Sequence, residues 1–200
     1  MPQGCSGRLT TGMLVGSAVC QTPSVFALVT SFLLLYTNVA SKPVWPCWAA
    51  VLGAGLACGL SAIGSGLGSG IVAEASCEGM SRQPRSAGVV TNGMLLGQAI
   101  AQTPAILGLL IAFILLFKTP EPTSQIAPAF ALLSSGLCMG IGAIGPAIGE
   151  GAAAQSAVRW MARNQENVGI ITRTMLVGMA VAESTAIYSM VIALILLFVV

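Results

Sequence analysis

Charged residues are what this chain has least of. Only 7% of its 200 residues are Asp, Glu, Lys or Arg, against about 25% in a typical soluble domain. Histidine is absent, and the few basic residues form no stripe with interleaved aromatic side chains, so nothing indicates a nucleic-acid partner. With 56% hydrophobic residues and a mean hydropathy of +0.90, the composition is that of an integral membrane protein.

Motifs for zinc and for phosphate are also missing. The six cysteines are scattered and have no zinc-ligand spacing, and in apolar stretches a free cysteine acts as a small hydrophobic residue. Gly64, Gly66 and Gly68 have the spacing of a phosphate-binding loop, but no β-strand precedes them and no Gly-Lys-Ser/Thr sequence follows. We therefore predict neither a zinc site nor a nucleotide site.

What the sequence does contain is an internal repeat of 81 residues. Segments that begin at Met13, Met94 and Met175 align without gaps, and each leads into an aliphatic stretch. A glycine-rich segment, residues 59–70, recurs as residues 140–151 at the same spacing. The repeating unit is a glycine-rich helix, a short polar turn and an aliphatic helix, and the chain holds half a unit followed by two whole units.

This pattern predicts an all-α membrane protein of tandem transmembrane helical hairpins with five spans. We expect an N-terminal half-repeat at 1–47 with one span near 11–37, a first hairpin at 48–128 with helices at 48–78 and 90–117, and a second hairpin at 129–200 with helices at 129–159 and 170–200. A signal peptide is the rival interpretation of residues 11–37. The apolar stretch is too long for one, and the repeat explains it better.

The basic residues predict the orientation of the hairpins. One side receives most of them (Arg8, Arg82, Arg85, Arg159, Arg163 and Arg173), and the other receives only Lys42 and Lys118. Because cytoplasmic loops are enriched in Lys and Arg, the polar turns at 81–85 and 163–166 should face the cytoplasm. The glycine spacing lets membrane helices approach closely, either in ordinary helix pairs or in the inner layer of a ring.

One carboxylate lies deep in the last predicted span. Glu183 is the only charged residue after Arg173. A carboxylate at membrane depth costs about 2.5–3.5 kcal/mol on insertion scales, so it marks a functional site by default. At 1.5 Å per residue, Glu183 lies about 15 Å and Glu150 about 14 Å from the same cytoplasmic end. Antiparallel neighbouring helices would therefore place both carboxylates at one depth.

Each repeat resembles the proteolipid (c subunit) of rotary ATP synthases and ATPases, through the glycine-rich helix, the turn Arg82-Gln83-Pro84 and the mid-membrane carboxylate. The phrase Val-Ala-Glu-Ser-Thr-Ala-Ile-Tyr at 181–188 resembles the sodium-binding form, and the duplicated hairpin resembles vacuolar-type proteolipids or the fused proteolipids of some bacterial sodium-dependent synthases. The resemblance implies a non-catalytic rotor-ring subunit, multi-pass in the bacterial inner membrane. Its implied partners are membrane lipid, further copies of itself or a shorter proteolipid, the stator a subunit, and central-stalk subunits at the cytoplasmic turns.

The resemblance further implies a Na⁺ site, with H⁺ as the alternative ion. In it, Glu183 would supply a carboxylate, Ser184 a hydroxyl and Val181 a backbone carbonyl from the adjacent hairpin, while Thr185 would hold a water and Tyr188 would hydrogen-bond Glu183. Hard cations prefer such oxygen ligands.

Glu150 stands where the sodium form usually has Gln. We expect it to be protonated and still to offer an oxygen to the ion, because two carboxylates and one Na⁺ would leave a surplus negative charge. The alternative is that Glu150 is unconnected to Glu183 and lines a wet cavity.

The other repeats lack the carboxylate. Gln21 and Gln102 occupy the position of Glu183, and Ser69 that of Glu150. One carboxylate for two hairpins would lower the number of ions moved per ATP and let a pump build a steeper gradient. Two rival functions are a secondary transporter built of repeats, which usually has inverted repeats or broken helices, and a structural proteolipid, which leaves Glu183 unexplained.

Overall fold

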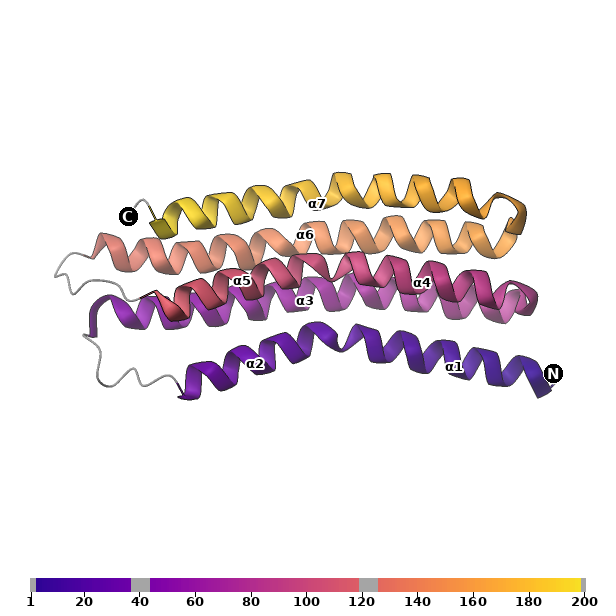
Figure 1. Ribbon diagram of the computed structural model, residues 1–200, viewed down its shortest axis with the longest axis horizontal. Coiled ribbons are helices and arrows are strands. Elements are labelled where there is room, and N and C mark those ends of the chain that lie inside the picture. The colour runs from indigo at the N-terminus through magenta and orange to yellow at the C-terminus, as the bar shows by residue number, and fades with distance from the viewer. Residues whose placement is uncertain (1–2, 37–43, 119–125, 199–200) are drawn as a thin grey trace.

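The computed structural model describes residues 3–36, 44–118 and 126–198, and within them the regular structure is helical. The α-helices are α1 (Gln3–Cys20), α2 (Thr22–Tyr36), α3 (Val44–Arg82), α4 (Ala87–Ala101), α5 (Thr103–Phe117), α6 (Ala127–Arg163) and α7 (Val168–Phe198). Two 3₁₀ turns, η2 (Pro84–Ser86) and η3 (Gln165–Asn167), join α3 to α4 and α6 to α7. The helices lie antiparallel in a long bundle (Figure 1).

The five predicted spans are confirmed. Five helical stretches in the described residues are long and apolar enough to cross a membrane: Gly7–Tyr36, Cys47–Arg82, Pro84–Phe117, Ala127–Arg163 and Gln165–Phe198. The glycine-rich helices extend two to four residues beyond the predicted limits at each end. The N-terminus and both 3₁₀ turns lie at the same end of the bundle (Figure 1), called the turn end below. This grouping agrees with the side to which the arginines were assigned.

Two of the aliphatic helices are interrupted, although the repeat predicts that each is continuous. α1 ends before Gln21 and α4 ends before Gln102. Each glutamine precedes a Thr-Pro pair, and a proline has no N–H to donate to the carbonyl four residues earlier. The carbonyls of Val19 and Ile100 are thereby released from the usual helical bond. Helix α7 has threonine at the equivalent position and runs unbroken from Val168 to Phe198.

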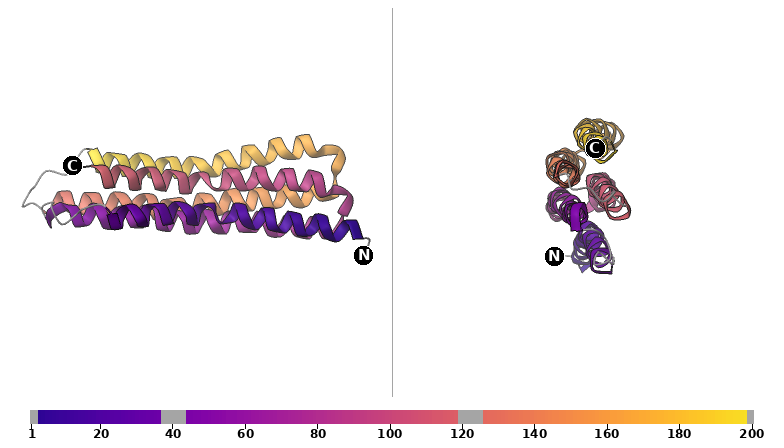
Figure 2. Two further views of the ribbon diagram at one scale, coloured as in Figure 1. Left: turned by 60° about the horizontal axis from the view of Figure 1, so that its bottom comes forward. Right: turned by 90° about the vertical axis from the view of Figure 1, so that its left-hand side faces the viewer.

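The helices form two layers, which are visible when the bundle is viewed along its axis (Figure 2). The glycine-rich layer consists of α3 and α6, which pack against each other along their length. In the aliphatic layer, α1–α2 packs on α3, α4–α5 packs on both α3 and α6, and α7 packs on α6. The chain is therefore a zigzag in which aliphatic and glycine-rich helices alternate, beginning and ending with an aliphatic one.

The glycines bring the backbones of α3 and α6 into contact, as their spacing predicts. A Cβ added to Gly64 would lie 2.7 Å from the Ile144 Cα, and one added to Gly140 would lie 2.6 Å from the Leu56 carbonyl oxygen. These distances are too short for any side chain, so the register of the two helices depends on the missing Cβ atoms.

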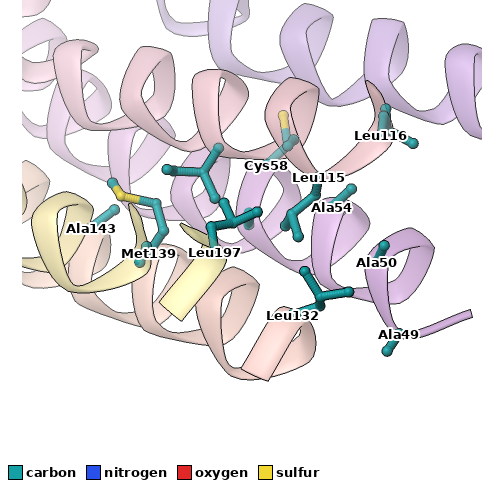
Figure 3. Close-up of a cluster of buried hydrophobic side chains, with 14 of the residues drawn as sticks. Ala49, Ala50, Ala54, Cys58, Leu115, Leu116, Leu132, Met139, Ala143 and Leu197 are labelled. Carbon is teal, nitrogen blue, oxygen red and sulfur yellow. The ribbon is translucent and has the colours of Figure 1, made fainter. Parts of the chain in front are cut away.

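Two apolar clusters flank a polar layer in the middle of the bundle. The cluster away from the turn end joins side chains such as Ala54, Leu115, Met139 and Leu197 from four helices (Figure 3). The cluster near the turn end joins helices α3, α4, α6 and α7. Between them lie six buried polar residues, which we call the polar layer: Ser61, Ser65, Ser69, Gln98, Gln102 and Glu150.

Candidate functional site

Glu150 is the polar group whose burial most needs an explanation. It lies on α6 in the polar layer and is 0% exposed. Neither of its carboxylate oxygens has a hydrogen-bond partner among the described residues. A buried carboxylate is tolerated only when a proton, a donor or a cation compensates its charge. The position therefore requires a species that binds to oxygen acceptors.

Glu183 lies beside it on the neighbouring helix. Its side chain is half-buried on α7, and the residues that precede the two carboxylates are in contact, because a Cβ added to Gly149 would lie 3.4 Å from the Ala182 Cβ. The prediction that antiparallel neighbours bring the two carboxylates to one depth is confirmed. Two carboxylates in one apolar setting repel each other, so a cation or proton between them would be strongly favoured.

The remaining predicted ligands lie on α7 itself. The Ser184 hydroxyl donates to the Val181 carbonyl at 2.7 Å, and the Thr185 hydroxyl donates to the Ala182 carbonyl at 2.9 Å. Val181 is 68% exposed and Tyr188 65% exposed. A hydroxyl that donates one bond keeps lone pairs for an ion. The ligand roles of Ser184, Val181 and Thr185, and the bond between Tyr188 and Glu183, stay predictions.

The first repeat shows what happens where the carboxylate is missing. Gln102 occupies the position of Glu183, and its Nε2 donates to the Val19 carbonyl at 2.7 Å. Gln98 Nε2 donates to the carbonyls of Gly16 and Ser69, both at 3.1 Å. The Val19 carbonyl is the one released by Pro23. Amide donors thus occupy the carbonyls at this interface between α1, α3 and α4, although the Gln98 Oε1 has no hydrogen-bond partner among the described residues.

The equivalent interface 81 residues later lacks these amide donors, because Met179 stands in place of Gln98 and a carboxylate in place of Gln102. Gln102 becomes Glu183, Val19 becomes Ile100, and Ser69 becomes Glu150. The Ile100 carbonyl, released by Pro104, accepts a bond from the Thr103 hydroxyl at 2.9 Å. Ile100 and Thr103 are candidate ligands that the sequence did not predict. The available signal was Pro104, because a proline inside an apolar helix exposes the carbonyl four residues before it.

The candidate ligands named for Glu150 and Glu183 are all oxygen atoms. In residues 3–36, 44–118 and 126–198 no three His, Cys, Asp or Glu side chains come together as they would around a transition metal. Carboxylate, hydroxyl and carbonyl oxygens suit a hard cation.

A second polar feature is a cavity of about 410 Å³ at the turn end. Glu78 forms ion pairs there with Arg82 at 2.6 Å and with Arg159 at 3.2 Å. Arg163 also lines the cavity. The turn end thus presents a partly neutralised cluster of arginines.

Comparison with known proteins gives the same family for both hairpins. The family model of the ATP synthase C subunit matches residues 52–115 and again residues 133–196. The ATP synthase c subunit of Thermotoga petrophila is 52% identical over 84 residues, which are 40% of this chain and 99% of that protein. Its counterpart in Petrotoga mobilis is 57% identical over 68 residues (34% and 71%), and that of Prochlorococcus marinus is 48% identical over 74 residues (37% and 91%).

A match in each whole repeat, together with five membrane-spanning stretches, shows that the chain belongs to the family of the ATP synthase C subunit, as a non-catalytic, multi-pass rotor protein of the bacterial inner membrane.

Proposed function

We propose that this chain translocates Na⁺ at a site formed by Glu183 and Glu150, and that it couples the ion flow to ring rotation and to ATP synthesis or hydrolysis. The observation that carries the proposal is the Glu150 carboxylate, buried beside Glu183 with both oxygens unpartnered among the described residues. A compensating cation removes the cost of burying these groups.

The ion would lie between α4–α5 and α6–α7. Glu183 and Glu150 each contribute an oxygen, and repeat equivalence supplies the Ile100 carbonyl and the Thr103 hydroxyl from the preceding hairpin. Val181 and Ser184 are the equivalents of Ile100 and Thr103. By repeat equivalence they would face the next interface along the ring, where an ion finds a carboxylate only if the next subunit carries one, because another copy of this chain has Gln102 there. For Ser184 this differs from the expected role beside Glu183.

The net charge of the site determines whether it can pass through lipid as the ring rotates. Two carboxylates and one Na⁺ leave one negative charge, which a proton on Glu150 removes. The loaded, neutral site can then face lipid, whereas a bare carboxylate cannot do so cheaply. Loading and release would therefore occur where a stator a subunit offers water and a countercharge. H⁺ is the alternative ion, since it also binds unpartnered carboxylates, but the hydroxyl and carbonyl oxygens favour Na⁺.

We propose that the turn end contacts the central stalk, because its arginine cluster offers an exposed polar surface outside the apolar spans. The exposed apolar side chains of α7, such as Val181 and Ile195, would face lipid or a neighbouring ring member, either another copy or a shorter proteolipid.

Carbodiimide labelling of purified membranes, read by mass spectrometry, tests the ion site. At constant pH we expect labelling at Glu183 that millimolar Na⁺ suppresses and K⁺ does not. Glu74, which is exposed on α3, serves as a carboxylate whose labelling Na⁺ should leave unchanged. Labelling that depends on pH alone would identify H⁺ as the ion. A Glu183 that is never labelled would contradict an exchangeable site.

A further inference from the structure

In the described residues, the aliphatic layer has one more span than the glycine-rich layer. The aliphatic layer consists of the spans α1–α2, α4–α5 and α7, whereas the glycine-rich layer consists of α3 and α6. If copies of the chain continue the zigzag side by side, α7 of one copy and α1–α2 of the next follow each other in the same layer. A regular alternation of the two layers has room for only one of them at that position.

The packing of α1 on α3 repeats in the packing of α4 on α6. Gly12 lies against Met80, and a Cβ added to Gly16 would be 3.2 Å from the Ala73 Cβ. The same pairs recur 81 residues later, where an added Cβ on Gly97 would be 2.7 Å from the Ala154 Cβ and Gly93 lies against Met161. The two aliphatic spans therefore occupy equivalent grooves in the same register.

Helix α7 is the third member of this series, but half of its groove is absent. Gly97 is enclosed, because an added Cβ would also lie 3.3 Å from Val72 on its other side. The equivalent Gly178 is exposed, and an added Cβ would contact only Ala153 among the described residues, at 3.6 Å. Gly16 and Gly97 each have an alanine of a glycine-rich helix as a second neighbour, Ala73 and Ala154. By the same rule, the second neighbour of Gly178 would be Ala73 of another copy. Within one chain Gly16 already occupies that place.

The glycine-rich layer is likewise open at both edges. The α3 residues that pack on α6 are Gly53, Gly64 and Gly68. Their equivalents on α6 are exposed: Ser134, Gly145 and Gly149. On the opposite edge of the layer, the α6 residues that contact α3 are Gly136, Gly140 and Gly151. Two of their equivalents on α3 are Gly59 and Gly70. A Cβ added to either of these would have nothing within 4 Å among the described residues. A second copy would therefore continue an interface that the chain already forms internally.

Charge at the turn end fits the same arrangement. Glu78 and Arg159 are repeat equivalents of opposite sign, and they pair at 3.2 Å while 37% and 44% of their side chains stay exposed. Placing α3 of a second copy beside α6 brings another Glu78 next to Arg159. The charges thus alternate in sign along the layer.

We propose that α1–α2 and the α7 helix of a second copy are alternative occupants of one groove on α3 and α4, so that α1–α2 must leave this groove when copies of the chain join. One hydrogen bond of the groove has an equivalent after the exchange. Gln98 donates to the Gly16 carbonyl while α1–α2 is in place, and α7 offers the equivalent carbonyl of Gly178. The Val181 carbonyl, equivalent to Val19, lies in an unbroken helix and already accepts a bond from Ser184, so Gln102 loses the partner that Pro23 released. The helix α1–α2 therefore acts as a cap on the edge of the free subunit, whichever ion the ring carries.

Paired cysteines, in a background without the native cysteines, report which helix occupies the groove. Gly16→Cys with Ala73→Cys should give a bridge within one chain when α1–α2 is in place. Gly178→Cys with Ala73→Cys should bridge two chains and produce a ladder of oligomers. Gly178→Cys with Ala153→Cys is the matched control, because the separation of 3.6 Å between an added Cβ on Gly178 and the Ala153 Cβ suits a disulfide within one chain in both states.

In the intact membrane complex we expect the oligomer ladder and loss of the Gly16–Ala73 bridge, and in the dissociated subunit the reverse. Retention of the Gly16–Ala73 bridge in the intact complex, without a ladder, overturns the proposal and means that α1–α2 stays in the groove. A second pair guards against misfolding. Thr174→Cys with Met80→Cys uses an exposed threonine equivalent to Gly12 and must give the same ladder.

Discussion

One close contact between the two helices of each hairpin pairs a glycine with a serine, placed on opposite helices in the two hairpins. In the first hairpin Ser61 of α3 faces Gly108 of α5, and in the second Gly142 of α6 faces Ser189 of α7. The positions are equivalent in the 81-residue repeat. A Cβ added to either glycine would lie 2.6 Å from the facing serine Cβ. The space therefore holds one side chain but not two.

We predict that Gly142→Ser destabilises the second hairpin by roughly 1–3 kcal/mol, the usual cost of an overpacked contact. Adding Ser189→Gly recreates the arrangement of the first hairpin and should return the stability to within about 0.5 kcal/mol of the original. The coupling energy between the two changes should be of a size seen only for residues in contact, roughly 0.5–3 kcal/mol.

A double-mutant cycle measures this coupling through loss of helical signal when the detergent-solubilised protein is unfolded by increasing SDS. The mirrored pair, Gly108→Ser with Ser61→Gly, serves as the control in the first hairpin and should behave in the same way. If Gly142→Ser alone has no effect, or if the double variant is no more stable than Gly142→Ser, the predicted overpacking is refuted.

Three further outcomes can be checked. Glu150→Gln should keep Na⁺ protection of Glu183 against carbodiimide, because an amide oxygen still ligates the ion, and a complete loss of protection would contradict the protonated-ligand role. Gln102→Glu replaces the donor to the Val19 carbonyl by an acceptor, so a new Na⁺-sensitive label should appear at position 102 in mass spectra; an unlabelled residue there would argue against latent ligands in the first hairpin. Gly68→Leu should cost roughly 3 kcal/mol or more in the same SDS titration, since overpacking against backbone has no easy relief. Gly66→Leu, whose added Cβ meets nothing within 4 Å in the described residues, should be tolerated in the isolated chain.

The spans and the depth of the carboxylates could be predicted because both depend on local properties. Hydropathy fixes which stretches cross the membrane, and the constant rise of a helix fixes how deep Glu150 and Glu183 lie. The breaks at Gln21 and Gln102 were also encoded, in the prolines two residues later, but a long apolar stretch hides such a break. Which groups bond to the released carbonyls could not be predicted, since this depends on which side chain of a neighbouring helix lies opposite each carbonyl.

Pairings between helices were not predictable from the repeat alone. That Gln98 reaches α1 and α3 at once, and that Gly142 faces Ser189, depends on the rotation of each helix about its axis. Periodicity leaves this rotation open, because a helix that is apolar on all sides has no marked face. Val181 and Ser184 are expected as ligands only through the resemblance to the sodium-binding form. The equivalent groups of the preceding hairpin, Ile100 and Thr103, become candidates only in the structure.

The amide of Gln102 also determines how far a rotor containing this chain must turn between two charges. Membrane voltage does work only on charge, about 2.3 kcal/mol per elementary charge per 100 mV, and the first hairpin carries none in the polar layer. With the proposed ion site, a sector of this kind would advance by two hairpin widths for each ion it exchanges. A stator would then have to hold the rotor against backward slip over that double step, and each ion would drive a longer rotation.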